Sequence, residues 1–320
     1  IVSSILFKSI KRKNGNNKIF LVCSIGNAEL ARQLSFIDKV FVYKKGFFNK
    51  LKLLIEINFL KISSLLVLDG KDRSILFSLF IFAKKKIYII NKKKFFFLFR
   101  NNKTNLIFDD ENKNYKIDII IKILSKLDII FSNEDLNIFK NEYFFKSLKE
   151  RKLKFLDNCN YNLLHYDEKW IVKSYIETYK NIELNFDNLN IFLNNIINKS
   201  QMDLVITSGK KISQPLDDLK KTMKFLDEGV YVKKNNNNFL YYIDQPSFNE
   251  LTEVIYKSKL CITCHGAPTH ISSILNIKTI DIIDLSKISL YRAYTKHLRN
   301  YNEVIRESAK DTTKKILTLL

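Results

Sequence analysis

The chain has 320 residues, 46% of them apolar, and its 54 Lys and Arg against 33 Asp and Glu give a net charge of +21. This length and apolar content suffice for a large core and, at roughly 150 residues per domain, predict two domains. The longest apolar stretch, 75–83, reaches about half of the roughly 20 residues that a transmembrane helix needs, and no known nucleic-acid-binding motif is visible. A membrane-spanning protein and a nucleic-acid partner are therefore not expected.

The first half of the chain alternates short β-branched runs with longer helical patterns. Strands are predicted at 18–23, 39–42, 65–68 and 86–90, and helices at 27–36, 47–59 and from residue 73 onward. A plain turn is expected at Asp69 and Gly70. Strands that alternate with helices in this way form right-handed βαβ units, so the pattern predicts a parallel sheet.

A second alternation follows a polar segment, 101–154, which is mostly helical in pattern and is expected to link two domains. Strands are predicted at 162–165, 203–207, 239–243, 260–263 and 279–283. Ser247 to Glu250 form a capping box that starts a helix, and 235–238 is expected to be a loop. The predicted fold class is α/β, with two doubly wound, Rossmann-like domains, 1–154 and 155–320, that face each other across a cleft.

The segment 260–276 is the most informative in the chain. A buried strand ends in a turn of small residues and passes directly into a helix, so the backbone N–H groups and the positive end of the helix dipole favour a phosphate. Gly266 and Ala267 let the backbone approach a diphosphate closely, and Thr269 and His270 can add side-chain donors. The sequence therefore predicts a phosphate site at this turn.

The same segment resembles the donor-binding signature of the heptosyltransferase family, glycosyltransferases of family nine with the GT-B fold, which usually show Asp-Thr-Gly-x-x-His before a small-residue helix. With the last histidines aligned, His270 matches the family His, Ala267 the Gly, Gly266 the Thr and His265 the Asp. The resemblance implies that these residues and Thr269 bind the donor. A histidine at position 265 in place of the aspartate implies altered handling of the donor sugar or diphosphate.

Weaker similarities cover most of the remaining chain. His165 to Trp170 is similar to a family loop that ends in a Lys-Trp pair, which implies that Lys169 contacts donor phosphate; we expect Trp170 to pack in the core. Val205 to Gly209 resembles a nucleoside-contacting turn, which implies donor contacts from Ser208 and Gly209.

The start of the chain, 1–11, resembles the first helix of the family, which follows a Gly-Asp pair. The resemblance places the general-base aspartate before Ile1, so no catalytic residue is identified within this sequence. It also implies that the domain 1–154 lacks its first strand and Gly-Asp loop, and that it holds the acceptor while 155–320 binds the donor.

The resemblance implies a metal-independent glycosyltransferase without a cofactor. It would move a heptose or related sugar from a nucleotide-diphosphate donor to a lipopolysaccharide-core or other saccharide or glycolipid acceptor. The helix terminus at Gly266 and the Lys169 ammonium would offset the charge of the leaving diphosphate. Four cysteines in a chain of this length do not form a disulfide framework, which predicts a reducing compartment and hence the cytoplasm.

The positive charge and the cysteines leave other interpretations open. Lysine excess is typical of a genome poor in G and C, yet the runs 84–86 and 92–94 near the aromatic run 95–97 suit an anionic membrane surface, which predicts peripheral binding to the inner face of the cytoplasmic membrane. A non-catalytic nucleotide- or carbohydrate-binding module is a second interpretation. Cys261-x-x-Cys264-His265 also matches the attachment pattern of a c-type haem, and zinc at these cysteines would need further ligands.

Overall fold

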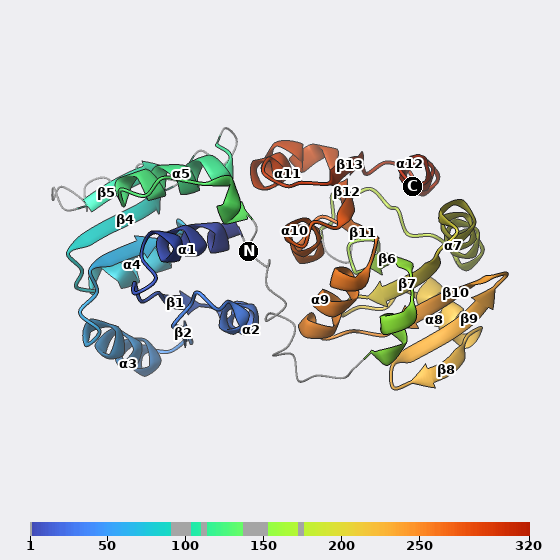
Figure 1. Cartoon of the computed structure of the whole chain (residues 1–320), viewed down its shortest axis with the longest axis horizontal. Coiled ribbons are helices and arrows are strands. Elements are labelled where there is room, and N and C mark those ends of the chain that lie inside the picture. The colour runs from blue at the N-terminus through green and yellow to red at the C-terminus, as the bar shows by residue number, and fades with distance from the viewer. Residues whose placement is uncertain (1, 91–103, 110–113, 137–152, 172–175) are drawn as a thin grey trace. The chain divides into compact units, whose positions relative to one another are not determined.

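The computed structural model describes residues 2–90, 104–109, 114–136, 153–171 and 176–320 (Figure 1). The chain divides into two compact units, one of Ile1–Ser147 with Arg292–His297, the other of Leu148–Tyr291 with Leu298–Leu320. The short segment Arg292–His297 thus belongs to unit 1 although it follows most of unit 2 in the sequence. Among the described residues, no helix is both long enough and apolar enough to cross a bilayer.

Unit 1 contains two parallel sheets. The strands β1 (Phe20–Cys23) and β2 (Lys39–Val42) pair with each other, and β3 (Ser64–Val67), β4 (Lys85–Ile90) and β5 (Thr104–Phe108) form the order β3-β4-β5. The helices are α1 (Val2–Lys13), α2 (Ile25–Gln33), α3 (Phe47–Asn58), α4 (Asp72–Leu79) and α5 (Lys116–Lys126), with a short 3-10 turn η2 (Asn133–Leu136). The βα alternation predicted for this half is confirmed.

The strand β5 corrects the sequence-based prediction, because its residues fall in the segment expected to be a mostly helical linker. It pairs in parallel with β4 from Lys86↔Thr104 to Ile90↔Phe108. Within it, Ile107 is buried and Phe108 is exposed. A five-residue strand flanked by Asn and Lys has too little apolar periodicity to be predicted, and its partner β4 stabilises it.

Unit 2 is built on one eight-stranded sheet with the order β13-β12-β11-β6-β7-β10-β9-β8. Its strands are β6 (Tyr161–Tyr166), β7 (Asp203–Ser208), β8 (Lys224–Asp227), β9 (Val230–Asn235), β10 (Asn238–Ile243), β11 (Leu260–Cys264), β12 (Lys278–Ile283) and β13 (Tyr301–Ile305). Its helical segments are η3 (Lys154–Asn158), α7 (Phe186–Ser200), α8 (Gln214–Lys221), α9 (Phe248–Lys257), α10 (Ala267–Ile274), η4 (Leu285–Lys287), α11 (Ile288–Thr295), which continues into the segment assigned to unit 1, and α12 (Ala309–Thr318). The strands from β13 to β10 are parallel, whereas β9 and β8 are antiparallel additions.

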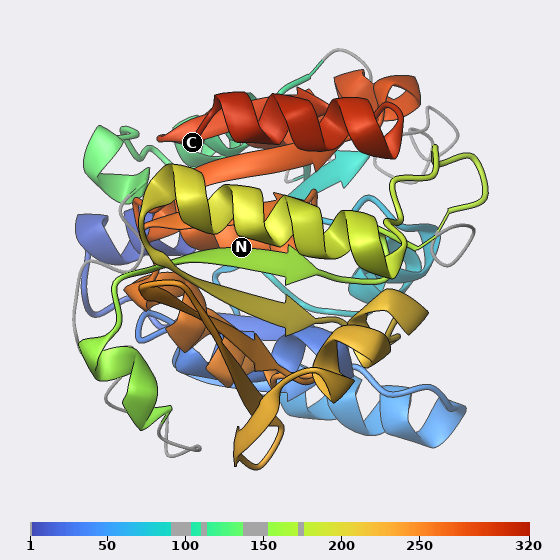
Figure 2. The same ribbon diagram turned by 90° about the vertical axis from the view of Figure 1, so that its right-hand side faces the viewer.

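The centre of this sheet is buried on both faces. Every residue of β6 and β11 is buried, because α7 and α12 cover one face and α9 and α10 the other (Figure 2). Strands buried on both sides have continuous apolar runs, which is why all five strands predicted in this half are present. The capping box at Ser247 and Glu250 is also confirmed, since both of its hydrogen bonds form.

Three strands of unit 2 were not predicted. All four residues of β8 are exposed, and β9 and β13 mix polar and apolar side chains, so none has a clear apolar pattern. The predicted loop 235–238 is shorter than expected, because Asn235 and Asn238 pair with each other and Asn236 takes the left-handed conformation, φ 53°, inside a hairpin.

Candidate functional site

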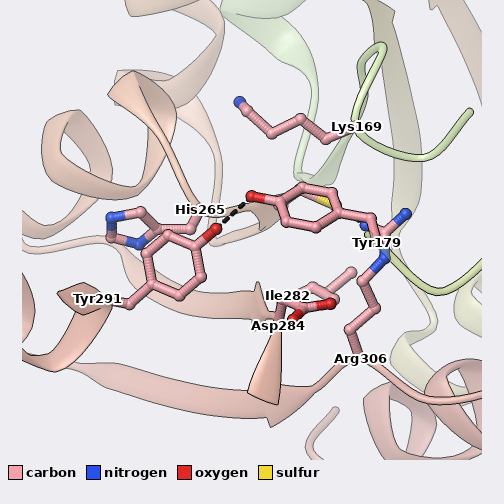
Figure 3. Close-up of a pocket in the computed structure, with 8 residues that line it drawn as sticks. Lys169, Tyr179, His265, Ile282, Asp284, Tyr291 and Arg306 are labelled. Carbon is pink, nitrogen blue, oxygen red and sulfur yellow. Dashed lines mark hydrogen bonds between the residues drawn. The ribbon is translucent and has the colours of Figure 1, made fainter. Parts of the chain in front are cut away.

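The residues that follow β6, β11, β12 and β13 meet at one edge of the sheet, because these four strands run parallel. Together with two tyrosines they line a small pocket (Figure 3). Its lining consists of Lys169, Tyr179, Cys264, His265, Ile282, Asp284, Tyr291 and Arg306. All eight residues belong to unit 2. The turn singled out by sequence analysis therefore lies beside a pocket at the carboxyl edge of a parallel sheet.

The loop after β6 is held between two glycines. A Cβ on Gly209 would lie 2.3 Å from Glu168 Oε2 and 3.0 Å from Asp167 Cα, and a Cβ on Gly266 would lie 2.7 Å from Lys169 Nζ. A side chain at either position would therefore collide with this loop. The contact with Gly266 places the Lys169 ammonium directly over the first residue of the α10 turn.

An internal ion pair fixes the conformation of Lys169. Its Nζ donates to Asp167 Oδ2 at 2.8 Å, and its backbone N–H donates to Asp167 Oδ1 at 3.1 Å. Both side chains are largely shielded, with 13% and 5% of their surfaces exposed. The cation is therefore oriented before any ligand arrives, which reduces the entropy lost on binding.

The start of α10 offers two backbone donors to an anion. Of the four amides that begin a helix without an intrahelical partner, that of Gly266 donates to Thr269 Oγ1 at 3.2 Å, and Pro268 has none. The N–H groups of Ala267 and Thr269 remain. These two amides, with Lys169 over Gly266, form a compact cationic end of the helix.

Thr269 has a different place from the one that the sequence suggested. Its side chain is 0% exposed, and its hydroxyl donates to Asp281 Oδ1 at 2.8 Å while it accepts from Gly266 N–H. The Thr269 side chain therefore supports the turn from below and does not point into the pocket. His270 lies one residue further along α10, half-buried, with its ring 5.4 Å edge-on from that of His265.

Asp281 is a buried carboxylate that organises the floor of the site. It is 0% exposed and accepts hydrogen bonds from His265 Nδ1 at 2.7 Å, Tyr301 OH at 2.9 Å and the Thr269 hydroxyl. A buried charge with three donors is stabilised by them. The bond to Nδ1 also fixes the imidazole tautomer, so the Nε2 atom of neutral His265 is a hydrogen-bond acceptor.

Ser208, the last residue of β7, and Gly209, which follows it, are not among the residues that line the pocket. Ser208 is 2% exposed, and its hydroxyl accepts from the Gln245 N–H at 2.8 Å and donates to Asp244 at 3.3 Å. These contacts tie the end of β7 to the loop after β10. Trp170 is fully buried and stacks on Tyr166 with ring centroids 4.6 Å apart, which confirms the prediction that it packs in the core.

The far side of the pocket consists of two tyrosines and an arginine. The hydroxyls of Tyr179 and Tyr291 hydrogen-bond each other across the pocket (Figure 3). The Arg306 guanidinium lies 4.8 Å from the Tyr179 ring centroid, and its Nε donates to the Lys180 carbonyl at 2.6 Å. A second buried cation thus faces the pocket opposite Lys169.

Both cysteines of the haem-like motif are buried thiols. Cys261 is 0% and Cys264 2% exposed, and both are free. Burial raises the pKa of Cys261 to about 12 and raises that of Cys264 as well. Thiols inside a strand cannot reach the vinyl groups of a haem, so this geometry does not support covalent attachment. In the part of the chain that the structure describes, no group of three or more His, Cys, Asp or Glu is arranged to hold a metal ion.

Sequence reasoning missed Tyr179, Asp281, Tyr291 and Arg306. A carboxylate inside the apolar strand 279–283 was a usable signal for Asp281, because buried Asp is rare unless it is paired. The other three residues come from a loop, from α11 and from the position after the unpredicted strand β13, so only the fold brings them together.

The whole chain is similar to solved glycosyltransferases. It matches the family 9 glycosyl transferase of Veillonella parvula with a TM-score of 0.69 and 14% identity, covering 99% of this chain and 86% of that one. It also matches the E. coli ADP-heptose lps heptosyltransferase II with a TM-score of 0.64 and 11% identity, covering 99% and 92%. The chain has the GT-B fold of the heptosyltransferases. No protein-family model and no curated protein matches its sequence.

A protein with a different reaction also has a similar fold. The UDP-GlcNAc 2-epimerase of Methanocaldococcus jannaschii matches with a TM-score of 0.50 and 14% identity, covering 99% of this chain and 88% of that one. The predicted fold class, two doubly wound GT-B units, is confirmed, but a fold at such low identity does not determine the reaction.

Proposed function

We propose that the chain is a glycosyltransferase that binds the diphosphate of a nucleotide-sugar donor at the pocket of unit 2. One observation carries the proposal: the Lys169 ammonium is held over Gly266, at the end of α10 where two amides remain for an anion. A cation and a helix N-terminus that converge at the carboxyl edge of a parallel sheet suit a phosphate.

In the proposed reaction, an acceptor hydroxyl attacks the anomeric carbon of the donor sugar while a general base takes the hydroxyl proton, and the nucleoside diphosphate leaves with the bonding electrons. Negative charge then increases on the diphosphate, where Lys169 and the amides of Ala267 and Thr269 offset it. Because these groups are already oriented, they need little rearrangement as the charge develops. Metal independence is part of this proposal.

His265 would contact the donor sugar or its phosphate. Asp281 fixes its ring and leaves Nε2 available, whereas the matching position of the heptosyltransferase signature is an aspartate. An imidazole can accept a sugar hydroxyl when neutral or donate to phosphate when protonated, and a carboxylate can only accept when ionised. The proposed donor sugar is therefore a heptose or a related sugar bound through different contacts.

The remaining parts of the proposal concern the acceptor and the setting. We place the saccharide or glycolipid acceptor, such as a lipopolysaccharide core, on unit 1, and the reaction in the cytoplasm. The four free cysteines are compatible with a reducing compartment.

Calorimetry with ADP and UDP, followed by assays with their sugar derivatives, tests the proposal. Lys169→Ala should weaken nucleotide diphosphate binding about 10- to 100-fold, as expected for a charge-assisted hydrogen bond. Lys224→Ala, which removes an exposed lysine of β8, is the matched control. Equal affinity in both variants would remove the diphosphate site from this pocket.

The product identifies the reaction class. Transfer of labelled sugar to an acceptor supports the glycosyltransferase. Conversion of the free nucleotide sugar to its epimer supports the reaction of the third structural neighbour. Tight nucleotide binding with neither product supports a non-catalytic binding module.

A further inference from the structure

Helix α3 of unit 1 carries apolar side chains on two opposite faces. Leu53 and Ile57 point into the core and are 7% and 4% exposed. On the other side Phe48, Leu51 and Ile55 recur at intervals of three and four residues, so they form one stripe along the helix. Phe48 is 83% exposed. A helix that only covers the core would carry polar residues on this face.

A neighbouring loop extends the stripe beyond the helix. Asn58, the last residue of α3, donates from Nδ2 to the Phe80 carbonyl at 3.0 Å and accepts from the Phe82 N–H at 2.8 Å. These bonds hold the loop after α4 against the end of α3, where Phe59 is also exposed. The exposed large side chains of this surface, which we call the α3 ridge, are Phe47, Phe48, Leu51, Ile55, Phe59, Phe80 and Phe82.

Helix α3 lies on the outside of unit 1 (Figures 1 and 2), and exposed lysines border the α3 ridge. The exposed lysines on and beside it are Lys44, Lys45, Lys52, Lys61 and Lys84. Glu56 is the acidic residue within α3. Because the apolar stripe is bordered by lysines, the surface is complementary to a partner that is apolar inside and anionic at its edge.

Among the described residues, the surface predicted from the sequence shares Lys84 with the α3 ridge. Of the run 84–86, Lys85 bonds to the Lys126 carbonyl, and Lys86 is half-buried with its Nζ 3.5 Å from the Ser78 and Leu79 carbonyls. Burial lowers the pKa of Lys86. The predicted runs 92–94 and 95–97 lie outside the described residues.

We propose that the α3 ridge binds unit 1 to the surface of a membrane rich in anionic lipid. The phenylalanines would enter the boundary between headgroups and acyl chains, and the lysines would contact the headgroup phosphates. A second copy of the chain is disfavoured because it would bring two lysine-rich borders together. The aliphatic Leu51 and Ile55 in the middle of the ridge suit acyl chains better than nucleic-acid bases.

Sedimentation of the full chain with lipid vesicles tests this proposal. Binding is expected with vesicles of phosphatidylcholine and phosphatidylglycerol, and should be much weaker with phosphatidylcholine alone. Each lysine near an anionic surface contributes about a fivefold gain in affinity. The triple variant Lys44→Gln, Lys45→Gln, Lys52→Gln should therefore lose about 100-fold. The double variant Phe48→Ser, Phe59→Ser should lose at least about tenfold.

Matched variants in unit 2 serve as controls. Phe225→Ser removes a phenylalanine that is 68% exposed, and Lys224→Gln, Lys234→Gln, Lys310→Gln removes three exposed lysines. Equal vesicle binding by ridge and control variants would overturn the proposal, as would equal binding to neutral vesicles. A dimer in analytical ultracentrifugation that Phe48→Ser dissociates, without vesicle binding, would assign the ridge to self-association instead.

The proposal does not rest on the donor site. Nucleotide binding measured by calorimetry should be the same in the ridge variants and in the unchanged protein. The vesicle assay therefore tests the membrane proposal, and nucleotide calorimetry tests the donor-site proposal, so either proposal can fail without the other.

Discussion

Replacing Gly266 by alanine separates the function of the α10 turn from its stability. The new Cβ would lie 2.7 Å from Lys169 Nζ, 3.7 Å from its Cε and 3.8 Å from the Cys264 carbonyl oxygen. The backbone itself tolerates alanine, because φ at Gly266 is 171°, an extended conformation. The steric conflict is therefore confined to the end of a flexible lysine side chain.

We expect Gly266→Ala to displace the ammonium while leaving the fold intact. Rotation of the lysine should cost at most about 1 kcal/mol of unfolding free energy, or a few degrees in Tm for a unit of this size. Loss of its charge-assisted contact should cost nucleotide diphosphate binding about 1.5–3 kcal/mol, or about 10- to 100-fold in Kd. Thermal denaturation and calorimetry with ADP and UDP measure the two quantities separately.

Gly209→Ala is the informative comparison. Its Cβ would meet Asp167 Cα at 3.0 Å and Asp167 Cβ at 2.9 Å, so backbone has to move. Overpacking of this kind typically costs about 1–3 kcal/mol of stability. Nucleotide affinity unchanged in Gly266→Ala, or a larger loss of stability there than in Gly209→Ala, would refute the argument that Gly266 exists to admit Lys169.

Three further outcomes follow from buried groups. Asp281→Asn leaves the donors of His265 and Tyr301 poorly matched and should lower the unfolding free energy in urea by about 3 kcal/mol; a loss below about 1 kcal/mol contradicts the assigned network. Burial lowers the pKa of His297 to about 4, so the unfolded state takes up a proton at this residue before the folded state does as the pH falls. The free energy of unfolding should therefore fall by about 2–3 kcal/mol between pH 6.5 and pH 4. The variant His297→Phe should show a smaller fall. Burial raises the pKa of Cys261 to about 12, so its thiol should not react with Ellman's reagent at pH 8 until the chain unfolds. The stability contributed by the protonated thiol should be lost as pH rises from 9 towards 12. Rapid labelling of this thiol in the native protein would contradict its burial.

The sequence predicted those parts of the fold in which local pattern and tertiary environment agree. The strands β6, β7, β10, β11 and β12 have apolar runs because helices cover both faces of the sheet. The strands β5, β8, β9 and β13 lack such runs, since they lie towards sheet edges and derive their stability from neighbouring strands. Edge strands therefore accounted for the errors in secondary structure.

Some residues of the candidate site could likewise be predicted from the sequence, and others could not. The turn at Gly266 and the cation Lys169 were predictable because a short motif carries their chemistry. Asp281 and Arg306 were not, because their roles depend on contacts with residues far away in the sequence, such as the bond from Arg306 to the Lys180 carbonyl. Thr269 shows a different limit. The motif includes this residue but does not reveal that its hydroxyl points towards Asp281.

At its β8 edge, the sheet of unit 2 is protected against the addition of strands from other chains. A parallel sheet that stopped at β10 would present unpaired amides and carbonyls beside an apolar strand, which is a template for stacking with other chains. The sheet instead continues through the antiparallel strands β9 and β8. The four residues of β8 are exposed, and its pairing with β9 is interrupted between Phe225 and Asp227. Such a short, irregular strand with charges at both ends is a poor template, so this edge of the sheet does not favour stacking with other chains.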